Sequence, residues 1–262
     1  MSNRGRFVWY DLMTTDVEGA KAFYGEVIGW KAEATDASPM PYTMWKLGDQ
    51  GVGGMMELPP QARQQGAPPH WIGYVVVDDV DRTCARSKEL GGRVLTEPMD
   101  VPGAGRFAVV MDPQGGVIAP FAPQNDVGGD GPTDRPGQIG WHELNATDYE
   151  AAWSFYQELF AWTHAQSMEM PDGGVYWMFQ RAGVDGSTGG MSSAAAQHGV
   201  PAHWLFYINV DDLDAAMERV KTNGGEVLAG PIDIPGDGRI AHCTDPQKAM
   251  FALVWMPDPD AA

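Results

Sequence analysis

The chain repeats itself, and this duplication constrains its fold more than any other feature. Residues 5–30 (GRFVWYDLMTTDVEGAKAFYGEVIGW) align without a gap with residues 137–162 (GQIGWHELNATDYEAAWSFYQELFAW), and eleven of the twenty-six positions are identical. The match continues, because HWIGYVVVDDVD from His70 returns as HWLFYINVDDLD from His203. A repeat of this length is a domain-sized unit rather than a solenoid repeat. The two halves therefore share one fold, and each can be compared with the other.

Length and charge limit what these halves can be. The chain has 262 residues, 44% of them hydrophobic, which suits two domains at the usual size of roughly 100–200 residues each. We predict one domain over residues 1–124, a linker rich in glycine and proline over 125–137, and a second domain over 138–262. The net charge of −18 repels phosphate backbones and anionic membrane surfaces. We therefore expect a small-molecule ligand as partner, and neither nucleic acid nor a membrane.

Cysteine use and the N-terminal residues bear on the compartment. Cys84 and Cys243 occupy non-equivalent positions of the duplication and form no CxxC spacing, so we interpret them as reduced thiols in the core. The N-terminal residues reach an acidic side chain before any apolar run, and no segment approaches the roughly 20 apolar residues of a membrane span. These features predict a cytoplasmic protein. The sequence leaves both a monomer and a homodimer open.

Periodicity and turn residues predict the same order of elements, βαβββ, four times. In the first copy a strand over residues 7–13 leads into a helix whose apolar stripe ends at Gly29, and strands over 42–47 and 52–57 follow. The helix starts have the spacing of capping boxes, with a threonine three residues before a glutamate: Thr15 with Glu18, and Thr147 with Glu150. The chain is therefore expected to be an α+β protein of four modules paired two by two.

Three motifs connect this order of elements with a known family. The helix ending FYxxxxGW at residues 23–30 and the signatures VDDVD at 77–81 and MDPQG at 111–115 resemble the vicinal oxygen chelate superfamily. That superfamily includes glyoxalase I, bleomycin resistance proteins and extradiol dioxygenases. More narrowly, the chain resembles the tandem two-domain proteins of actinobacterial type known as glyoxalase-like or hydroxylase-like. The resemblance covers nearly the whole chain and implies two cup-shaped domains, each made of two modules.

The resemblance also implies where metal ligands stand in members that use a metal. These positions lie on the first strand of each module and on the last strands, and in this chain they hold Trp9, Trp141, Ile72, Leu205, Ala119 and Ala252. Zinc, nickel or iron sites need about three converging His, Glu, Asp or Cys donors, and none of these side chains is such a donor. We therefore predict no metal and no other cofactor.

Residues with the strand parity of these positions are expected to face the cups, because side chains alternate along a strand. On the first strands they include the carboxylates Asp11 and Glu143, each two residues from a tryptophan. A carboxylate held against an indole, away from water, is a candidate general base or acid. The alternative is that both carboxylates only accept hydrogen bonds from neighbouring groups.

The other side chains expected in the cups are mostly aromatic or apolar. The predicted ligand-binding residues are Trp9, Met13, Met55, His70, Ile72, Tyr74, Trp141, Asn145, Met191, His203, Leu205 and Tyr207. Methionine is flexible and polarizable, which suits an adaptable pocket, although Met55 and Met191 are equally interpreted as core residues. His70 and His203 have a second interpretation as residues that begin a strand and cap a loop. His142 has the opposite parity and is expected at the surface.

Three hypotheses about function follow. The first is a glyoxalase- or bleomycin resistance-like protein that binds an apolar or aromatic small molecule in metal-free cups, with acid/base chemistry through Glu143 or Asp11. The second is a metal-dependent lyase or isomerase of glyoxalase type with displaced donors, namely Glu143, His203 and His242. His242 breaks the symmetry of the duplication, because Val109 is its counterpart. The third is a non-catalytic interaction protein whose cups are filled by their own side chains.

Overall fold

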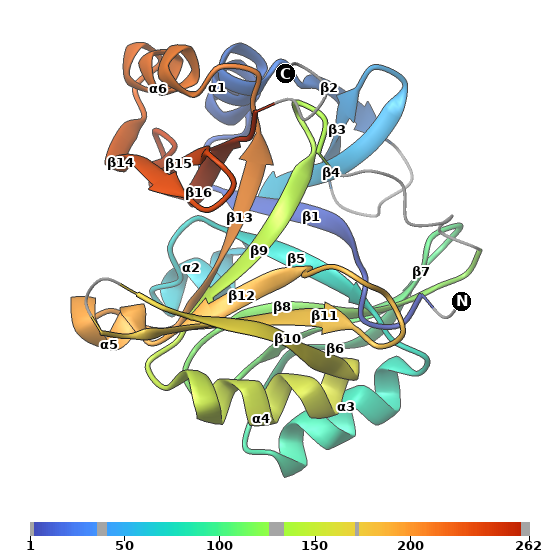
Figure 1. Ribbon diagram of the computed structural model, residues 1–262. Helices are drawn as coiled ribbons and strands as arrows, with labels where there is room; N and C mark the ends of the chain where they lie inside the picture. Colours follow the sequence, from blue (N-terminus) through green and yellow to red (C-terminus); the bar gives the residue numbers. More distant parts are fainter. Residues whose placement is uncertain (1–2, 36–40, 126–133, 171–172, 258–262) are drawn as a thin grey trace. The chain divides into compact units, whose positions relative to one another are not determined.

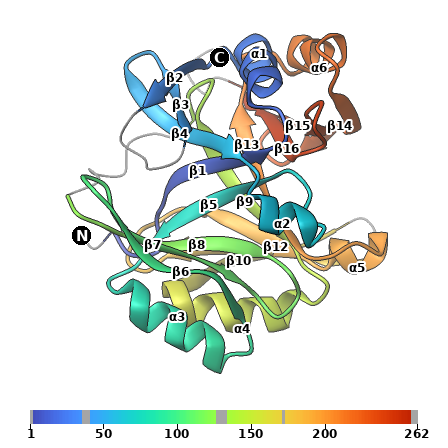
Figure 2. The same ribbon diagram turned by 180° about the vertical axis from the view of Figure 1, so that it is seen from behind.

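A computed structural model describes residues 3–35, 41–125, 134–170 and 173–257 of the chain (Figure 1). Within these ranges strands and short helices alternate in the order that the duplication predicts (Figure 2). No helix in the described part of the chain is long and apolar enough to cross a lipid bilayer. The architecture is α+β, as predicted.

Each half of the chain contains two βαβββ modules joined by a connection that holds a short extra helix. The first half consists of β1 (Phe7–Thr14), α1 (Val17–Ile28), β2 (Lys31–Thr35), β3 (Tyr42–Leu47), β4 (Gln50–Glu57), α2 (Pro60–Gln64), β5 (His70–Val76), α3 (Val80–Glu89), β6 (Arg93–Val101), β7 (Gly105–Met111) and β8 (Val117–Pro123). The second half consists of β9 (Ile139–Asn145), α4 (Tyr149–Phe160), β10 (Trp162–Glu169), β11 (Val175–Arg181), β12 (Gly189–Ser192), α5 (Ala194–His198), β13 (His203–Asn209), α6 (Leu213–Thr222), β14 (Glu226–Ile234), β15 (Gly238–Thr244) and β16 (Met250–Trp255). We number the modules one to four, beginning at β1, β5, β9 and β13.

Two eight-stranded mixed sheets repeat one topology. The strand order is β2-β3-β4-β1-β5-β8-β7-β6 in the first sheet and β10-β11-β12-β9-β13-β16-β15-β14 in the second. In each module the first strand pairs in parallel with the last, as β1 does with β4 and β9 does with β12. The hairpins within a module pair antiparallel. The orders match once the numbering is offset by eight, which confirms the fold of four βαβββ modules.

Packing groups the modules differently from the duplication. Unit 1 comprises Met1–Trp9, Ile72–Gly131 and His142–Leu205, and therefore mainly modules two and three. Unit 2 comprises Tyr10–Trp71, Pro132–Trp141 and Phe206–Ala262, and therefore mainly modules one and four. The predicted domains 1–124 and 138–262 remain a prediction, and residues 126–133 of the predicted linker lie outside the described residues.

Unit 2 is held together by a buried hydrogen-bond network that joins modules one and four and includes the indole of Trp71, at the start of β5. Helices α1 and α6 pack side by side (Figures 1 and 2). The hydroxyl of Tyr24, on α1, donates to Oδ2 of Asp245 at 3.2 Å and accepts a hydrogen bond from the Trp71 indole at 3.0 Å. Oδ1 of Asp245 accepts from the backbone amides of Gln247 and Ala249, both at 2.9 Å. Burial raises the pKa of Tyr24 well above its ordinary value and also raises the pKa of Asp245.

Unit 1 contains the same network, which joins modules two and three where α3 packs against α4 and includes the indole of Trp204, at the start of β13. The hydroxyl of Tyr156 donates to Oδ2 of Asp112 at 2.7 Å and accepts from the Trp204 indole at 3.1 Å. Oδ1 of Asp112 accepts from the amides of Gln114 at 2.7 Å and Gly116 at 2.9 Å. Each aspartate thus closes its own Asp-Pro turn and binds a helix from the other half of the duplication.

The helix starts correct one prediction. The N-caps are Asp16 and Asp148, whose carboxylates accept hydrogen bonds from the first-turn amides, so the capping boxes predicted at Thr15 and Thr147 are wrong. Aspartate caps a helix at least as well as threonine, and its charge is favourable at the positive end of the helix dipole. The predicted stop at Gly29 is confirmed, because Gly29 ends α1 with a left-handed φ of 87°.

The two cysteines agree with their prediction. Cys84 and Cys243 are buried and form no disulfide. Burial raises the pKa of Cys84 to about 11 and that of Cys243 to about 12. Both side chains are therefore protonated thiols at neutral pH and behave as small core residues.

His142 corrects a second prediction, because it is buried rather than at the surface. Its ring stacks on Phe7 with centroids 3.8 Å apart, and Nδ1 lies 2.7 Å from the carbonyl oxygen of Thr188. Strand alternation does place His142 opposite Glu143, but that opposite face is the packed core of unit 1. Burial lowers the pKa of His142 to about 4.

We expect Tyr156→Phe to lower the free energy of unfolding by about 1–3 kcal/mol, because the buried Asp112 and Trp204 each lose a hydrogen-bond partner. The matched control is Tyr149→Phe, whose hydroxyl bonds Glu150 at an exposed position, 3.3 Å away. The control is expected to change stability by less than about 0.5 kcal/mol. Urea unfolding measures both. Equal stability of Tyr156→Phe and the unchanged protein would show that the network contributes nothing.

We expect His142 to make the protein less stable at acid pH. Because its folded pKa of about 4 lies below the unfolded value of 6.5, the unfolded chain takes up the proton first. The stability that His142 contributes is complete above about pH 6.5 and is lost as the pH falls towards 4, by about 3 kcal/mol in total. His142→Phe keeps a ring against Phe7 and removes this loss. The difference in unfolding free energy between the two proteins should therefore change between about pH 7 and pH 4, and a constant difference would contradict the assignment.

Candidate functional site

A carboxylate, a tyrosine and a glycine meet on one face of the first module. Asp11 of β1 is aligned with Gly54 of β4, and Gly54 with Met44 of β3, so these positions share a face of the sheet. Tyr42, two residues before Met44, has the same parity, and its hydroxyl donates to Oδ1 of Asp11 at 2.6 Å. A Cβ atom at Gly54 would collide with the Tyr42 hydroxyl. Glycine is thus required for the ring to cross the strand and reach the carboxylate.

The third module repeats this arrangement within unit 1. Glu143 of β9 is aligned with Gly190 of β12, and Gly190 with Met178 of β11. The hydroxyl of Tyr176 donates to Oε2 of Glu143 at 3.0 Å. A Cβ atom at Gly190 would collide with the Tyr176 ring. We call the two surfaces the Asp11 face and the Glu143 face.

The side chains next to each carboxylate differ between the two faces. Beside Asp11, the aligned pair is Met13 with Met56. Beside Glu143, the aligned pair is Asn145 with Ser192. The Asp11 face is therefore apolar around its carboxylate, whereas the Glu143 face offers an amide and a hydroxyl.

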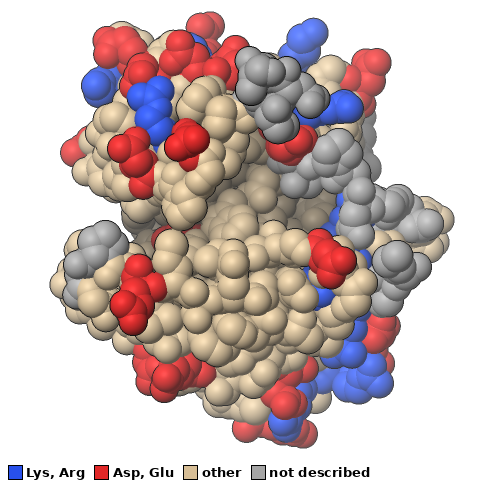
Figure 3. All heavy atoms as spheres, in the orientation of Figure 1, with Lys and Arg blue, Asp and Glu red and all other residues tan. Residues whose placement is uncertain are grey.

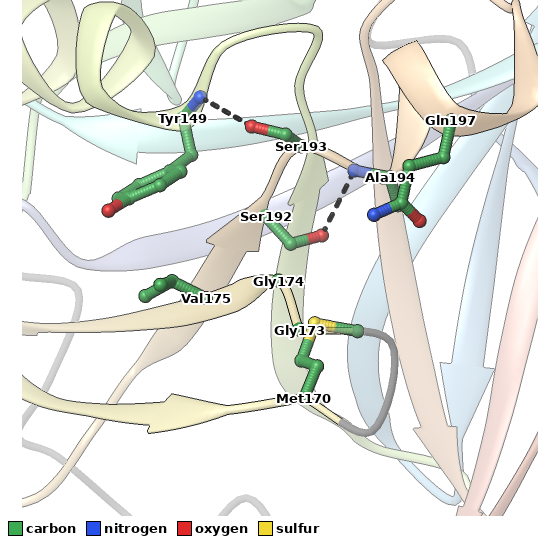
Figure 4. A pocket seen from close by; sticks show the side chains of 9 residues that line it. All are labelled: Tyr149, Met170, Gly173, Gly174, Val175, Ser192, Ser193, Ala194 and Gln197. Atoms are coloured by element: carbon green, nitrogen blue, oxygen red, sulfur yellow. Dashed lines mark hydrogen bonds between the residues drawn. The ribbon is translucent and has the colours of Figure 1, made fainter.

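A cavity of about 240 Å³ opens at the Ser192 end of β12 (Figure 4). It lies wholly in unit 1 and is lined by Tyr149, Met170, Gly173, Gly174, Val175, Ser192, Ser193, Ala194 and Gln197. The Ser193 hydroxyl accepts from the Tyr149 amide at 3.2 Å, and the Ser192 hydroxyl accepts from the Ala194 amide at 3.4 Å. The surface of unit 1 over β10 and β11 is largely uncharged in the view of Figure 3. Both features suit an uncharged ligand more than an ionic one.

Module four contains a tyrosine–histidine pair that module two lacks. Tyr207 of β13 is aligned with Ala252 of β16, which is aligned with His242 of β15, and the Tyr207 hydroxyl lies 2.9 Å from Nε2 of His242. In module two, the equivalent Tyr74 instead packs against Phe107, with ring centroids 5.6 Å apart. Unit 2 thus has a polar tyrosine–histidine pair at the position where unit 1 has a contact between two aromatic rings.

The donors expected for a displaced metal site are not grouped. Among the residues that the structure describes, no three His, Cys, Asp or Glu side chains lie close enough together to hold a metal ion. Glu143, His203 and His242 therefore do not form the trio that the second hypothesis requires. Ala119 and Ala252, at the family's last-strand ligand positions, are fully buried and have no donor atom. The residues present do not fit a metal centre of the usual composition.

The two strand-initial histidines have the local role given by their second interpretation. Nδ1 of His70 lies 2.7 Å from the carbonyl oxygen of Pro68, and Nδ1 of His203 lies 3.0 Å from that of Pro201. Burial lowers the pKa of His70. These contacts cap the preceding loops and orient both rings, while a role of either ring in binding a ligand remains a prediction.

Two predicted ligand-binding methionines belong to the core. Met55 is aligned with Leu12, and Met191 with Leu144, so both lie on the faces opposite the carboxylates. Each is fully buried, with an exposed fraction of 0%. We therefore retain the core interpretation for both. The roles of Trp9, Ile72, Tyr74, Trp141, Leu205 and Tyr207 in binding remain predictions.

The sequence reasoning missed the tyrosine and the glycine of each face. Both copies contain Tyr-x-Met, at residues 42–44 and 176–178, and Gly-Gly-Met, at residues 53–55 and 189–191. The comparison of the two halves therefore carried the signal. Both tyrosines stand on a different strand from the carboxylates, and alternation along one strand does not predict the register between strands.

Comparison with known proteins agrees with the fold. The model of the glyoxalase/bleomycin resistance protein/dioxygenase superfamily matches residues 6–119 and 138–253. The putative glyoxylase CFP32 of Mycobacterium tuberculosis is 36% identical over 251 residues, covering 94% of this chain and 93% of the relative. The anthracycline biosynthesis protein DnrV of Streptomyces peucetius is 31% identical over 261 residues, covering 95% and 93%.

Solved structures share the architecture at low sequence identity. The Mn(II)-bound glyoxalase from Novosphingobium aromaticivorans superimposes with a TM-score of 0.64 at 16% identity, covering 98% of this chain and 84% of that chain. The 2,3-dioxygenase LapB from Pseudomonas sp. KL28 also has a TM-score of 0.64, at 14% identity, covering 100% and 97%. Such identities establish the fold alone. The family model, which matches both halves of the chain, and the two relatives show that the chain belongs to the glyoxalase/bleomycin resistance protein/dioxygenase superfamily.

Proposed function

We propose that the protein binds an aromatic or largely apolar small molecule on the Asp11 and Glu143 faces without a metal ligand. The observation that carries this proposal is the duplicated carboxylate–tyrosine pair, Asp11 with Tyr42 and Glu143 with Tyr176. The acidic residue is an aspartate in one copy and a glutamate in the other, yet its hydrogen bond with the tyrosine is present in both. Each pair stands on the sheet face opposite the helix-packed core, and both tyrosines and Glu143 are partly exposed there.

The pair is suited to hold a hydroxyl group of a ligand. A tyrosine hydroxyl both donates and accepts, so while it donates to the carboxylate its oxygen can accept from a phenol or alcohol. Donation to an ionised acceptor strengthens the bond and polarises the tyrosine. Asp11 and Glu143 are then the groups through which a proton could pass to or from the ligand, which gives cofactor-independent acid/base chemistry.

The methionines support an aromatic ligand. Met13, Met44 and Met56 share the Asp11 face, and Met178 shares the Glu143 face. Methionine adapts to flat rings and makes favourable sulfur–aromatic contacts. The similarity to DnrV points the same way, because that relative is named for the biosynthesis of anthracyclines, which are fused-ring aromatic compounds.

The test is a calorimetric titration with 2-naphthol, a planar aromatic with one hydroxyl. We expect the double variant Asp11→Asn, Glu143→Gln to bind it about tenfold to a hundredfold more weakly, because a hydrogen-bond network on a charged group contributes about 1.5–3 kcal/mol. The matched control is the double variant Glu18→Gln, Glu89→Gln, which removes two charges from exposed positions on α1 and α3 and should bind as the unchanged protein does. Unaltered binding by the double variant would refute the role of the carboxylates.

The metal-free part of the proposal has its own readout. The protein is dialysed against EDTA and titrated again, and we expect the same affinity for 2-naphthol. Loss of binding that Mn²⁺, Zn²⁺ or Fe²⁺ restores would favour the metal-dependent hypothesis instead.

A further inference from the structure

We infer that the two faces bind different classes of ligand. The Asp11 face takes an aromatic compound with a single hydrogen-bonding group, and the Glu143 face takes an aromatic compound with a further hydroxyl or amide. This inference rests on the proposed function and adds the residues that set specificity. They are the aligned pairs Met13 with Met56 and Asn145 with Ser192.

The aligned pairs occupy equivalent places, so their difference is a difference between the two sites. Met13 follows Asp11 by two residues, as Asn145 follows Glu143, and each lies beside its partner on the last strand of the module. Met13 is 8% exposed and Asn145 is 7% exposed. The two side chains are therefore equally buried, but one is apolar and the other is polar. Position and burial are retained, and only the chemistry offered to a ligand changes.

The Asn145 amide points to a polar ligand group. Its side chain is 7% exposed and lies two residues from Glu143 on the same face, aligned with Ser192. An amide can both donate to and accept from a ligand hydroxyl or amide, so it stabilises a polar group that the face removes from water. The same ligand group placed over Met13 and Met56 would lose its water and gain no partner.

The cavity beside Ser192 gives the second polar group a place. Ser192 belongs both to the Glu143 face and to the cavity wall, where Ser193 and Gln197 add further polar atoms (Figure 4). The volume of the cavity, about 240 Å³, is below the roughly 300 Å³ at which pockets for whole ligands begin. The cavity therefore fits a substituent of a ligand rather than a complete molecule. The first half has Met56, Glu57 and Leu58 where the second has Ser192, Ser193 and Ala194.

Single-face variants separate the two specificities. The variant Glu143→Gln weakens binding on the Glu143 face and leaves the Asp11 face intact. The variant Asp11→Asn does the reverse. Each is titrated with 2-naphthol and with 2,7-dihydroxynaphthalene, which differ by one hydroxyl. We expect Asp11→Asn protein to bind the dihydroxy compound about tenfold more tightly than 2-naphthol, and Glu143→Gln protein to show no such preference or the reverse.

The specificity residues are then tested in the Asp11→Asn background. Asn145→Leu, which is close in size, together with Ser192→Ala should abolish the preference, while Met13→Asn in the Glu143→Gln background should create one. Thermal unfolding confirms that each variant is folded, and the single-face comparison needs no change in either pair. Equal preference ratios for the two single-face proteins would overturn this inference and leave the proposed function standing. Failure of the unchanged protein to bind either naphthol would overturn both.

Discussion

The buried bonds from Tyr24 to Asp245 and from Tyr156 to Asp112 are the constraint on which the units depend. In each, a tyrosine from a module-initial helix reaches the aspartate that closes a turn in the other half of the chain, and a tryptophan indole completes the network. A buried polar group is costly unless it is bonded, so these contacts specify which modules pack together. The duplication thus yields two units that each mix the halves.

Strand alternation then gives strand β9 two faces of different composition. On β9, His142 and Leu144 face the core, while Glu143 and Asn145 face away from it. The cores are dense in aromatic rings, whereas the opposite faces hold a carboxylate, a tyrosine and a glycine in contact. Two glycines make this contact possible. Because Gly54 and Gly190 have no Cβ atom, a tyrosine can cross a strand whose other side is packed in the core.

The sequence was sufficient for most of the fold, because the duplication doubles every weak signal. Two helices that each contain a Phe-Tyr pair and two Asp-Pro turns, at matched spacing, leave few topologies open. Parity also grouped Asp11 with Met13 and Glu143 with Asn145, and the strand registers have each pair on one face. It failed for contacts across strands, since the register that brings Tyr42 over Gly54 depends on a bulge near Trp45 that periodicity does not reveal. The burial of His142 was missed for a related reason, because its partners Phe7 and Thr188 are far away in sequence.

The two copies differ less in their core network than in the side chains around Asp11 and Glu143. The core network keeps its tyrosine, aspartate and tryptophan in both units, because the loss of any one would leave a buried polar group without a hydrogen-bond partner. The carboxylate–tyrosine contact is also kept, although its acid varies. The positions that change from methionine to asparagine and serine lie one strand step beyond it, where a substitution alters what a ligand meets without altering the core. Duplication has therefore preserved the carboxylate–tyrosine contact and varied the side chains beside it, which is the pattern expected if, as we infer, the two faces bind different molecules.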